Sequence, residues 1–272
     1  RILNSKPDGM ILLALEDITD LAATNDLLTA ENTQLQKNNE QLETFTAAAS
    51  HDLQEPLRKI QMFCKRIFEN EKNLSESSKH NLERVLFSAA NMSQLISDLI
   101  NYSRINLIEK EYKKTDVNLL LKKTLGDLKD TISERNAEIT FGSFPQLNVI
   151  PYQIQQLFSN LITNSIKYTK EGITPEIKIE TEQSSKEEIN EIGADPEKNY
   201  VKISITDNGI GFSKDYEKRI FAPFYRLHNN DQYSGSGLGL AIVKKIVANH
   251  QGFIKAISSL DTGTTMLIYI PL

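Results

Sequence analysis

Leucine recurs at every seventh position from residue 21, and asparagine occupies a second position of the same repeat. The apolar positions are Leu21, Leu28, Leu35, Leu42 and Ala49, and the asparagine positions are Asn25, Asn32 and Asn39. This period predicts a coiled coil, and buried amides at one core position fix its register and favour two parallel strands. A solvated single helix that packs on its own domain is the alternative interpretation.

Helical periodicity continues beyond the heptads. The positions that carry it are Phe45, Leu53, Leu57, Ile60 and Ile67. They predict one helix over about residues 20–70. A serine-rich break at 75–78 precedes a second amphipathic helix, whose apolar face reaches Leu99. Such a hairpin forms a four-helix bundle when two chains associate, so the pattern predicts a homodimer.

The first twenty residues have a different pattern. Residues 9–20 predict a strand that leads into a helix start, with Thr19 or Asp20 as N-cap. The strand resembles the exit strand of a PAS sensor domain, which implies a sensor domain upstream. Because the chain starts at Arg1 without methionine, we expect a fragment. Its longest apolar stretch, 10–15, is too short to span a bilayer, so we expect no membrane contact here and any membrane anchor upstream.

The pattern changes again after a charged segment at 109–114. The expected helices are 118–133, 152–168 and 238–249, and the expected strands are 137–141, 176–182, 200–206, 252–258 and 264–270. Residues 183–199 are acidic and predict a solvated hairpin loop without chemistry. The expected fold is α+β with two domains. The expected segments are a sensor strand and linker at 1–20, a coiled coil at 21–48, a helical dimerisation domain at 49–112 and an α/β sandwich at 115–272.

Composition excludes some classes of function. The chain has 272 residues, of which 39% are hydrophobic, and a formal net charge of −5. Lysine and arginine are scattered among acids, which disfavours nucleic-acid binding. The single cysteine, Cys64, allows no internal disulfide and no CxxC site, so we expect a reducing, cytoplasmic environment.

Two glycine clusters mark the C-terminal half. They are Asp207-Asn-Gly-Ile-Gly-Phe212 and Gly235-Ser-Gly-Leu-Gly-Leu240. Neither has the spacing of a P-loop or of a complete dinucleotide-binding fingerprint. Gly235, Gly237 and Gly239 precede a predicted helix, where free N–H groups bind phosphate well.

A polar stripe lies upstream of these clusters. Asn160, Asn164, Lys167 and Tyr168 share related faces of one predicted helix at spacings of three and four. An amide oxygen together with phosphate oxygens and water is sufficient to hold Mg²⁺, and Lys167 would neutralise phosphate. Asparagines that cap or decorate a surface helix are the alternative.

These segments, with Phe221-Ala-Pro-Phe-Tyr-Arg226, resemble the N, G1, F and G2 boxes of the histidine kinase ATP-binding domain. That fold is shared with type II topoisomerases and mismatch-repair ATPases, and the resemblance covers about 115 to the end. It implies that Asp207 accepts a hydrogen bond from the adenine amino group, that Asn164 with Asn160 binds Mg²⁺, that Lys167 contacts phosphate and that Tyr168 lies against the base. Further nucleotide positions that it implies are Gly209, Gly211, Phe212, Gly235, Gly237, Leu238, Gly239 and Leu240.

The flap between the glycine clusters contains two aromatic residues and a cation. We expect Phe221 and Phe224 to anchor the flap. Arg226 is the candidate that stabilises charge near the transferring phosphoryl group.

The segment Ser50-His-Asp-Leu-Gln-Glu-Pro-Leu-Arg58 resembles the H box of the phosphoacceptor domain. The resemblance implies that His51 is phosphorylated from ATP and that the phosphoryl group passes to an aspartate of a response-regulator receiver domain. Pro56 removes a helical hydrogen bond to the carbonyl of Asp52, and the resulting distortion would let Asp52 reach the His51 ring. Asp52 would hold the Nδ1 proton and leave Nε2 as the nucleophile.

One position departs from the family. Many members carry Thr or Asn four residues after the histidine, where it orients water for dephosphorylation of the regulator, but Glu55 stands here. We therefore expect weak phosphatase activity. Glu55 also lies on the face of His51, where it could share the role of Asp52.

Two other functions compete with a kinase. One is an ATPase or ATP-gated clamp of the same superfamily, although Asn160 stands where those enzymes carry a catalytic base. The other is a non-catalytic dimeric signalling scaffold, which the intact motifs argue against. The sequence identifies neither the stimulus nor the regulator, and it does not decide between phosphorylation within one subunit and between two.

Overall fold

The computed structural model describes residues 19–71, 73–105, 111–227 and 235–272. The strand expected at 9–18 lies outside these residues. The chain forms two compact units, Arg1–Phe45 and Thr46–Leu272. Among the described helices, none is long and apolar enough to cross a membrane.

Helix α1 (Thr19–Asn70) begins in the first unit and continues into the second. Its bounds confirm the helix predicted from the apolar period, and it runs through Pro56 without a break. Within the first unit, Leu27 and Leu28 are 62% and 57% exposed. A single chain therefore leaves apolar residues of this helix uncovered.

Helix α2 (Glu76–Arg104) begins at Ser75, whose side chain accepts a hydrogen bond from the N–H of Ser78 at 3.2 Å. A small cluster of Leu57, Ala89 and Ile96 joins α2 to α1. Large apolar residues on both helices remain exposed in the single chain. They include Leu53, Ile60, Phe63, Ile67, Val85, Phe87 and Met92.

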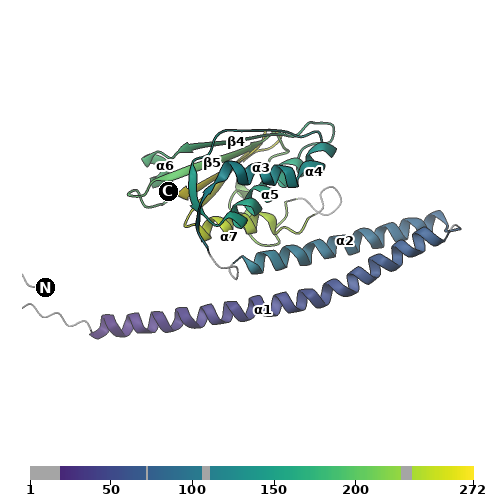
Figure 1. The fold of residues 1–272 in the computed structure, drawn as a ribbon, viewed down its shortest axis with the longest axis horizontal. Coiled ribbons are helices and arrows are strands. Elements are labelled where there is room, and N and C mark those ends of the chain that lie inside the picture. The colour runs from purple at the N-terminus through teal and green to yellow at the C-terminus, as the bar shows by residue number, and fades with distance from the viewer. Residues whose placement is uncertain (1–18, 72, 106–110, 228–234) are drawn as a thin grey trace, which may run out of the picture. The chain divides into compact units, whose positions relative to one another are not determined.

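The rest of the second unit is an α/β sandwich, as expected (Figure 1). Its five-stranded sheet has the order β2 (Glu138–Phe141), β4 (Glu176–Gln183), β5 (Tyr200–Asp207), β7 (Gly263–Pro271) and β6 (Phe253–Ser259). Strands β2 and β4 are parallel, and the other neighbours are antiparallel. The helices are α3 (Val117–Asp127), α4 (Lys129–Glu134), α5 (Pro151–Lys167) and α7 (Gly239–Asn249).

The structure differs from the predicted elements in the strands and helices that flank the main sheet. A two-stranded antiparallel sheet of β1 (Lys113–Asp116) and β3 (Gln146–Val149) was not expected. The helix expected at 118–133 is divided at Leu128, which ends α3 and begins α4.

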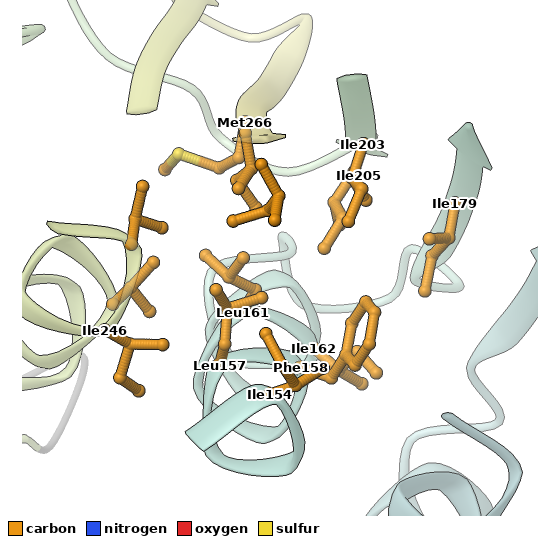
Figure 2. Packing of buried hydrophobic residues seen from close by; sticks show 14 of the residues in the cluster. Ile154, Leu157, Phe158, Leu161, Ile162, Ile179, Ile203, Ile205, Ile246 and Met266 are labelled. Carbon is orange, nitrogen blue, oxygen red and sulfur yellow. The ribbon is translucent and has the colours of Figure 1, made fainter. Parts of the chain in front are cut away.

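Alternation along the strands buries one face of the sheet against the helices. Ile177 and Ile179 of β4 are 2% and 0% exposed, and Ile203 and Ile205 of β5 are 2% and 1% exposed. Figure 2 shows how α5 supplies the central layer of this core. Its contributing residues are Ile154, Leu157, Phe158, Leu161 and Ile162. Because α5 is fixed along its length, the polar side chains on its remaining face have defined positions.

The expectation of a solvated loop at 183–199 is wrong. Helix α6 (Lys186–Glu191) forms there, with a reciprocal capping box between Ser185 and Glu188. Ile189 of this helix is 3% exposed and packs with Tyr200 and Tyr269 on the other face of the sheet. The acidic residues of this segment therefore surround a small apolar cluster, which their composition concealed.

Candidate nucleotide-binding site

A cavity opens between the C-terminal half of α5, the end of β5 and the N-terminal end of α7. Its lining residues are Leu161, Asn164, Ser165, Tyr168, Asp207, Ile210, Gly211, Phe212, Ile220, Tyr225, Arg226, Leu227, Leu240, Thr264 and Met266. A wider groove adjoins it and includes Asn160, Lys167 and the second glycine cluster. The structure thus brings together most of the nucleotide residues implied by the sequence.

Asp207 ends strand β5 and lies at the wall of this cavity. Its Oδ1 accepts hydrogen bonds from the backbone N–H groups of Gly209 at 2.9 Å and Thr264 at 3.1 Å. Its Oδ2 accepts a hydrogen bond from Ser165 Oγ at 3.1 Å. Burial raises the pKa of Asp207, and these three hydrogen bonds oppose that rise. Its carboxylate is therefore held in one orientation.

The first glycine cluster, which follows β5, lies close to the backbone at the ends of β6 and α5. A β-carbon at Gly211, whose φ is +58°, would lie 2.0 Å from the carbonyl oxygen of Ser259. One at Gly209 would lie 2.9 Å from the carbonyl oxygen of Tyr168. These glycines are required by packing, which brings the end of β5 against the end of α5.

The second glycine cluster lies beside Lys167 and the flap. A β-carbon at Gly235 would be 2.6 Å from Lys167 Nζ, and one at Gly237 would be 2.8 Å from the carbonyl carbon of Phe224. Leu238 lies in the core, unlike the glycines on either side of it. Its side chain is fully buried in the core, and its N–H donates to Ser236 Oγ at 3.1 Å. Neither group of Leu238 is offered to a nucleotide.

The asparagines of α5 converge on the first residue of α7. A β-carbon at Gly239 would lie 3.7 Å from Asn164 Nδ2 and 3.8 Å from Asn160 Oδ1. The Nδ2 atom of Asn160 is buried and has no hydrogen-bond partner among the described residues. Because the two ends of an amide are interchangeable by rotation, either Asn160 atom can face a ligand. No group of three His, Cys, Asp or Glu residues that could hold a metal occurs in the described part of the chain.

Lys167 and Tyr168 contact each other at the end of α5. Lys167 Nζ donates to the Tyr168 hydroxyl at 3.0 Å and lies 4.4 Å from the centre of its ring. The lysine therefore lies beside the aromatic side chain expected to cover the base and beside Gly235. A cation at this point is placed to meet the phosphates of a bound nucleotide.

The flap is anchored by only one of the two expected aromatic residues. Phe221 is 6% exposed and belongs to the core, but Phe224 is 59% exposed with φ at +61°. The expectation for Phe224 is wrong, because its backbone packs against Gly237 while its ring faces outward. Arg226 lines both the cavity and the adjoining groove.

The last two turns of α2 and the residue after them contact the α/β domain through three hydrogen bonds. Asp98 accepts a hydrogen bond from Ser236 of the second glycine cluster. The Tyr102 carbonyl accepts one from Lys245 Nζ of α7 at 2.8 Å, and Gln153 Nε2 donates to the Ile105 carbonyl at 3.0 Å. The end of α2 is therefore joined to the second glycine cluster, to α7 and to α5.

Replacing Asp98 by asparagine should raise ADP affinity about two- to fivefold, the scale of one interaction between partly exposed charges. Its carboxylate lies at a loop where phosphate would bind, so its negative charge opposes the ligand. Titration calorimetry measures the change. Glu83→Gln is the matched control, because Glu83 lines the same groove. An equal gain in both variants, or none in Asp98→Asn, would contradict the local role of Asp98.

The phosphoacceptor candidates lie on α1. His51 falls within this helix, and its side chain lies outside the described atoms. Asp52 is exposed. Glu55 receives two hydrogen bonds from Arg58, each at 3.0 Å, and lies 3.5 Å from Lys59. The Arg58 hydrogen bond lowers the pKa of Glu55, so this side chain remains a carboxylate. Its two oxygens are engaged with Arg58, which disfavours the suggested bond to the His51 ring.

Three residues of the site were missed by reasoning from the sequence. Ser165 and Thr264 bind Asp207, and Ser236 Oγ accepts a hydrogen bond from the N–H of Leu238 just before α7. Ser165 follows a metal candidate directly, but a small residue at a buried helix position gives no pattern. The pairing of Thr264 with Asp207 depends on strand register, which the sequence alone does not specify.

Two family models match the chain. The model for the histidine kinase-, DNA gyrase B- and HSP90-like ATPase matches residues 150–272, and the model for the His Kinase A phospho-acceptor domain matches residues 41–107. The cavity and its motifs thus lie in the domain that the first model matches, which is of the nucleotide-binding ATPase class. Because the phospho-acceptor domain precedes it, the chain belongs to the sensor histidine kinases and contains their catalytic core.

Relatives agree with this class, and a solved structure shares the fold. Phytochrome-like protein Cph1 of Synechocystis sp. is 33% identical over 265 residues, which cover 97% of this chain and 32% of that protein. Sensor-like histidine kinase SenX3 of Mycobacterium tuberculosis is 28% identical over 233 residues, which cover 84% of this chain and 53% of that protein. Full-length ShkA in complex with AMPPNP shares the fold, with a TM-score of 0.60 and 22% identity over 83% of this chain and 45% of that one. The chain spans about a third of the length of the phytochrome-like relatives.

Proposed function

We propose that this chain transfers the γ-phosphoryl group of Mg-ATP to His51 and then to an aspartate of a receiver domain. The observation that carries the proposal is the convergence of three groups on the cavity and the groove that adjoins it. These groups are the fixed carboxylate of Asp207, the two asparagines of α5 and the glycine cluster before α7. A nucleotide site needs a group that recognises the base, ligands for the metal ion and a loop that binds phosphate. The three groups supply these functions in that order.

The proposed reaction is in-line attack of His51 Nε2 on the γ-phosphorus. The N–P bond forms while the bond from that phosphorus to the β,γ-bridging oxygen breaks, and ADP leaves. Asp52 holds the proton on Nδ1, which keeps Nε2 free to attack. Lys167 and Arg226 balance the charge on the transferring group. Tyr168 lies against the base, which Asp207 binds through the amino group.

The α5 asparagines suit a magnesium ion that is shared with phosphate. Mg²⁺ keeps several waters and takes few protein ligands, so Asn164 with Asn160 would hold it beside the phosphates. The buried Asn160 amide nitrogen without a partner supports this assignment, because a ligand at that point would reorder the amide. Bound there, the ion would neutralise charge on the phosphates.

The proposed partners follow from the phospho-acceptor domain. A homodimer would cover the exposed apolar residues of α1 and α2 and pair the heptads of the coiled coil. The receiver domain accepts the phosphoryl group, and an upstream sensor domain would act through α1. A cytoplasmic location agrees with the use of ATP as substrate.

Incubation of the chain with γ-labelled ATP and Mg²⁺ tests the proposed reaction. The expected product carries a label that is labile in acid and stable in base, as a phosphohistidine is, and α-labelled ATP leaves none. An acid-stable label would point to another acceptor. Release of inorganic phosphate without labelled protein would favour the ATPase of the same superfamily.

Substitution Glu55→Thr should increase phosphatase activity toward a phosphorylated receiver domain, about tenfold or more if one lost water-orienting hydrogen bond accounts for the deficit. Glu55 remains ionised beside Arg58, so it repels an acyl phosphate and donates no hydrogen bond to water. Phosphate release from a loaded receiver domain with ADP present measures the rate.

Glu69→Thr is the matched control, because Glu69 is another exposed carboxylate on the same helix. Its phosphatase rate should equal that of the wild type. Fast release by the wild type that Glu55→Thr abolishes would show that Glu55 promotes dephosphorylation instead.

A further inference from the structure

Ser165 of α5 directs its hydroxyl differently from two other buried hydroxyls of the α/β domain, Thr124 of α3 and Thr169 just after α5. Thr124 and Thr169 each donate to the backbone carbonyl four residues earlier, at 2.9 and 2.8 Å. Ser165 is 6% exposed and donates to Asp207 Oδ2 on a different element. Because the usual backbone acceptor lies within reach of a helical serine, this choice is specific to Asp207.

The two oxygens of Asp207 have different surroundings. Oδ1 accepts two backbone N–H groups, from Gly209 and Thr264. Oδ2 accepts its described hydrogen bond from Ser165 alone, and both residues line the cavity. Removal of the Ser165 hydroxyl would therefore leave Oδ2 without the only donor recorded for it in the described part of the chain.

The protonation state of Asp207 decides which purine it can bind. An ionised carboxylate only accepts hydrogen bonds, whereas a protonated acid also donates one. A 6-amino purine presents a donor at this position, and a 6-oxo purine presents an acceptor. A carboxylate therefore rejects the 6-oxo purine, and a carboxylic acid accepts it.

We propose that Ser165 is a specificity-determining positioning residue, which keeps Asp207 a pure acceptor and so favours 6-amino over 6-oxo purine nucleotides. The inference rests on the proposed nucleotide site. Burial of Asp207 favours its neutral form, and Ser165 supplies one of three hydrogen bonds that favour the charged form. The two remaining bonds both act on Oδ1.

Other titratable groups line the cavities that Asp207 borders but form no hydrogen bond with it among the described contacts. Tyr168 of α5 and Tyr225 and Arg226 of the flap line the same cavity. A second hollow that Asp207 also borders is lined by Glu138 of β2 and by Glu176 and Lys178 of β4. The pKa of Asp207 is governed by burial and its three hydrogen bonds rather than by these charges.

The test compares ADP with inosine diphosphate, whose base has a carbonyl at position 6. Titration calorimetry on the 272-residue chain gives both affinities between pH 5.5 and 8 for the wild type, Ser165→Ala and Thr169→Val. Thr169→Val removes a buried hydroxyl from the same end of α5 that does not bind Asp207. Thermal unfolding without nucleotide reports whether each variant is folded.

Ser165→Ala should bind ADP roughly fivefold more weakly at neutral pH, the effect of one hydrogen bond. The deficit should grow as pH falls, because protonated Asp207 loses an acceptor for the amino group. Over the same range, the preference for ADP over inosine diphosphate should shrink. Ser165→Thr, which keeps the hydroxyl, should restore the preference, and Thr169→Val should match the wild type.

Three results would overturn the proposal. A folded Ser165→Ala chain with unchanged preference at every pH would do so, as would a loss equal for both nucleotides. A loss in Ser165→Ala that Thr169→Val reproduces would show a packing effect. Wild-type chain that binds neither nucleotide would reject the nucleotide site itself, which separates that failure from a failure of Ser165 alone.

Discussion

Replacing His51 by glutamine should reduce autophosphorylation roughly a thousandfold or more, because the variant lacks the nucleophile that the reaction requires. The amide of glutamine has no nucleophilic lone pair on nitrogen. ADP affinity should remain near that of the wild type, because the nucleotide residues lie on the α/β domain and His51 on α1. Labelling with γ-labelled ATP and calorimetry with ADP measure the two properties separately.

His80→Gln is the matched control for this variant. His80 is an exposed histidine on α2, so its loss should leave labelling intact. Label retained by His51→Gln and lost in His80→Gln would identify His80 as the acceptor. Label retained by both variants would place the phosphoryl group elsewhere and contradict the assignment of the H box.

The long helices and the main sheet could be predicted because each satisfies one period over many residues. Helix α1 follows its apolar period for 52 residues, and the strands β4 and β5 alternate over eight each. Strand β1 consists of four polar residues without apolar alternation, and β3 has only Leu147 and Val149 as apolar positions. Helix α6 was missed because its buried face consists chiefly of Ile189, which acidic neighbours surround.

Site residues that belong to sequence motifs could be predicted. Contacts that arise only when the chain folds could not. Asp207, Asn164 and Lys167 stand in recognisable patterns, and the structure brings them to one cavity and its adjoining groove. The Ser165 contact with Asp207 joins residues 42 positions apart, and no local pattern encodes it. Leu238 shows the opposite error, because membership of a glycine motif concealed a core residue.

Replacing Asp207 by asparagine should weaken ADP binding by roughly a hundredfold or more, because a buried donor would then face another donor. The reason lies in how fully the carboxylate is used. Oδ1 accepts from the N–H groups of Gly209 and Thr264, and Oδ2 accepts from Ser165 Oγ. An asparagine amide has one acceptor end and one donor end.

Neither orientation of that amide suits the site. With its oxygen toward Gly209 and Thr264, the NH₂ group can donate to Ser165 Oγ, but it faces the amino group of adenine, which is also a donor. With its oxygen toward Ser165, the NH₂ group faces two backbone N–H groups, which cannot move without disturbing β7 and the first glycine cluster. The loss of ADP affinity in Asp207→Asn should therefore exceed the effect of one lost hydrogen bond.

Calorimetry with ADP measures this loss, and the unliganded melting temperature reports whether the variant is folded. Asp215→Asn is the control, because Asp215 is exposed in the short 3-10 helix Lys214–Tyr216 after β5 and does not line the cavity. Wild-type affinity should itself fall as pH is lowered, since burial raises the pKa of Asp207 and protonation removes the acceptor for adenine. That pH dependence should disappear in Asp207→Asn, which has no proton to gain at this position. A folded variant that binds ADP as the wild type does, with the same pH dependence, would show that another residue reads the base.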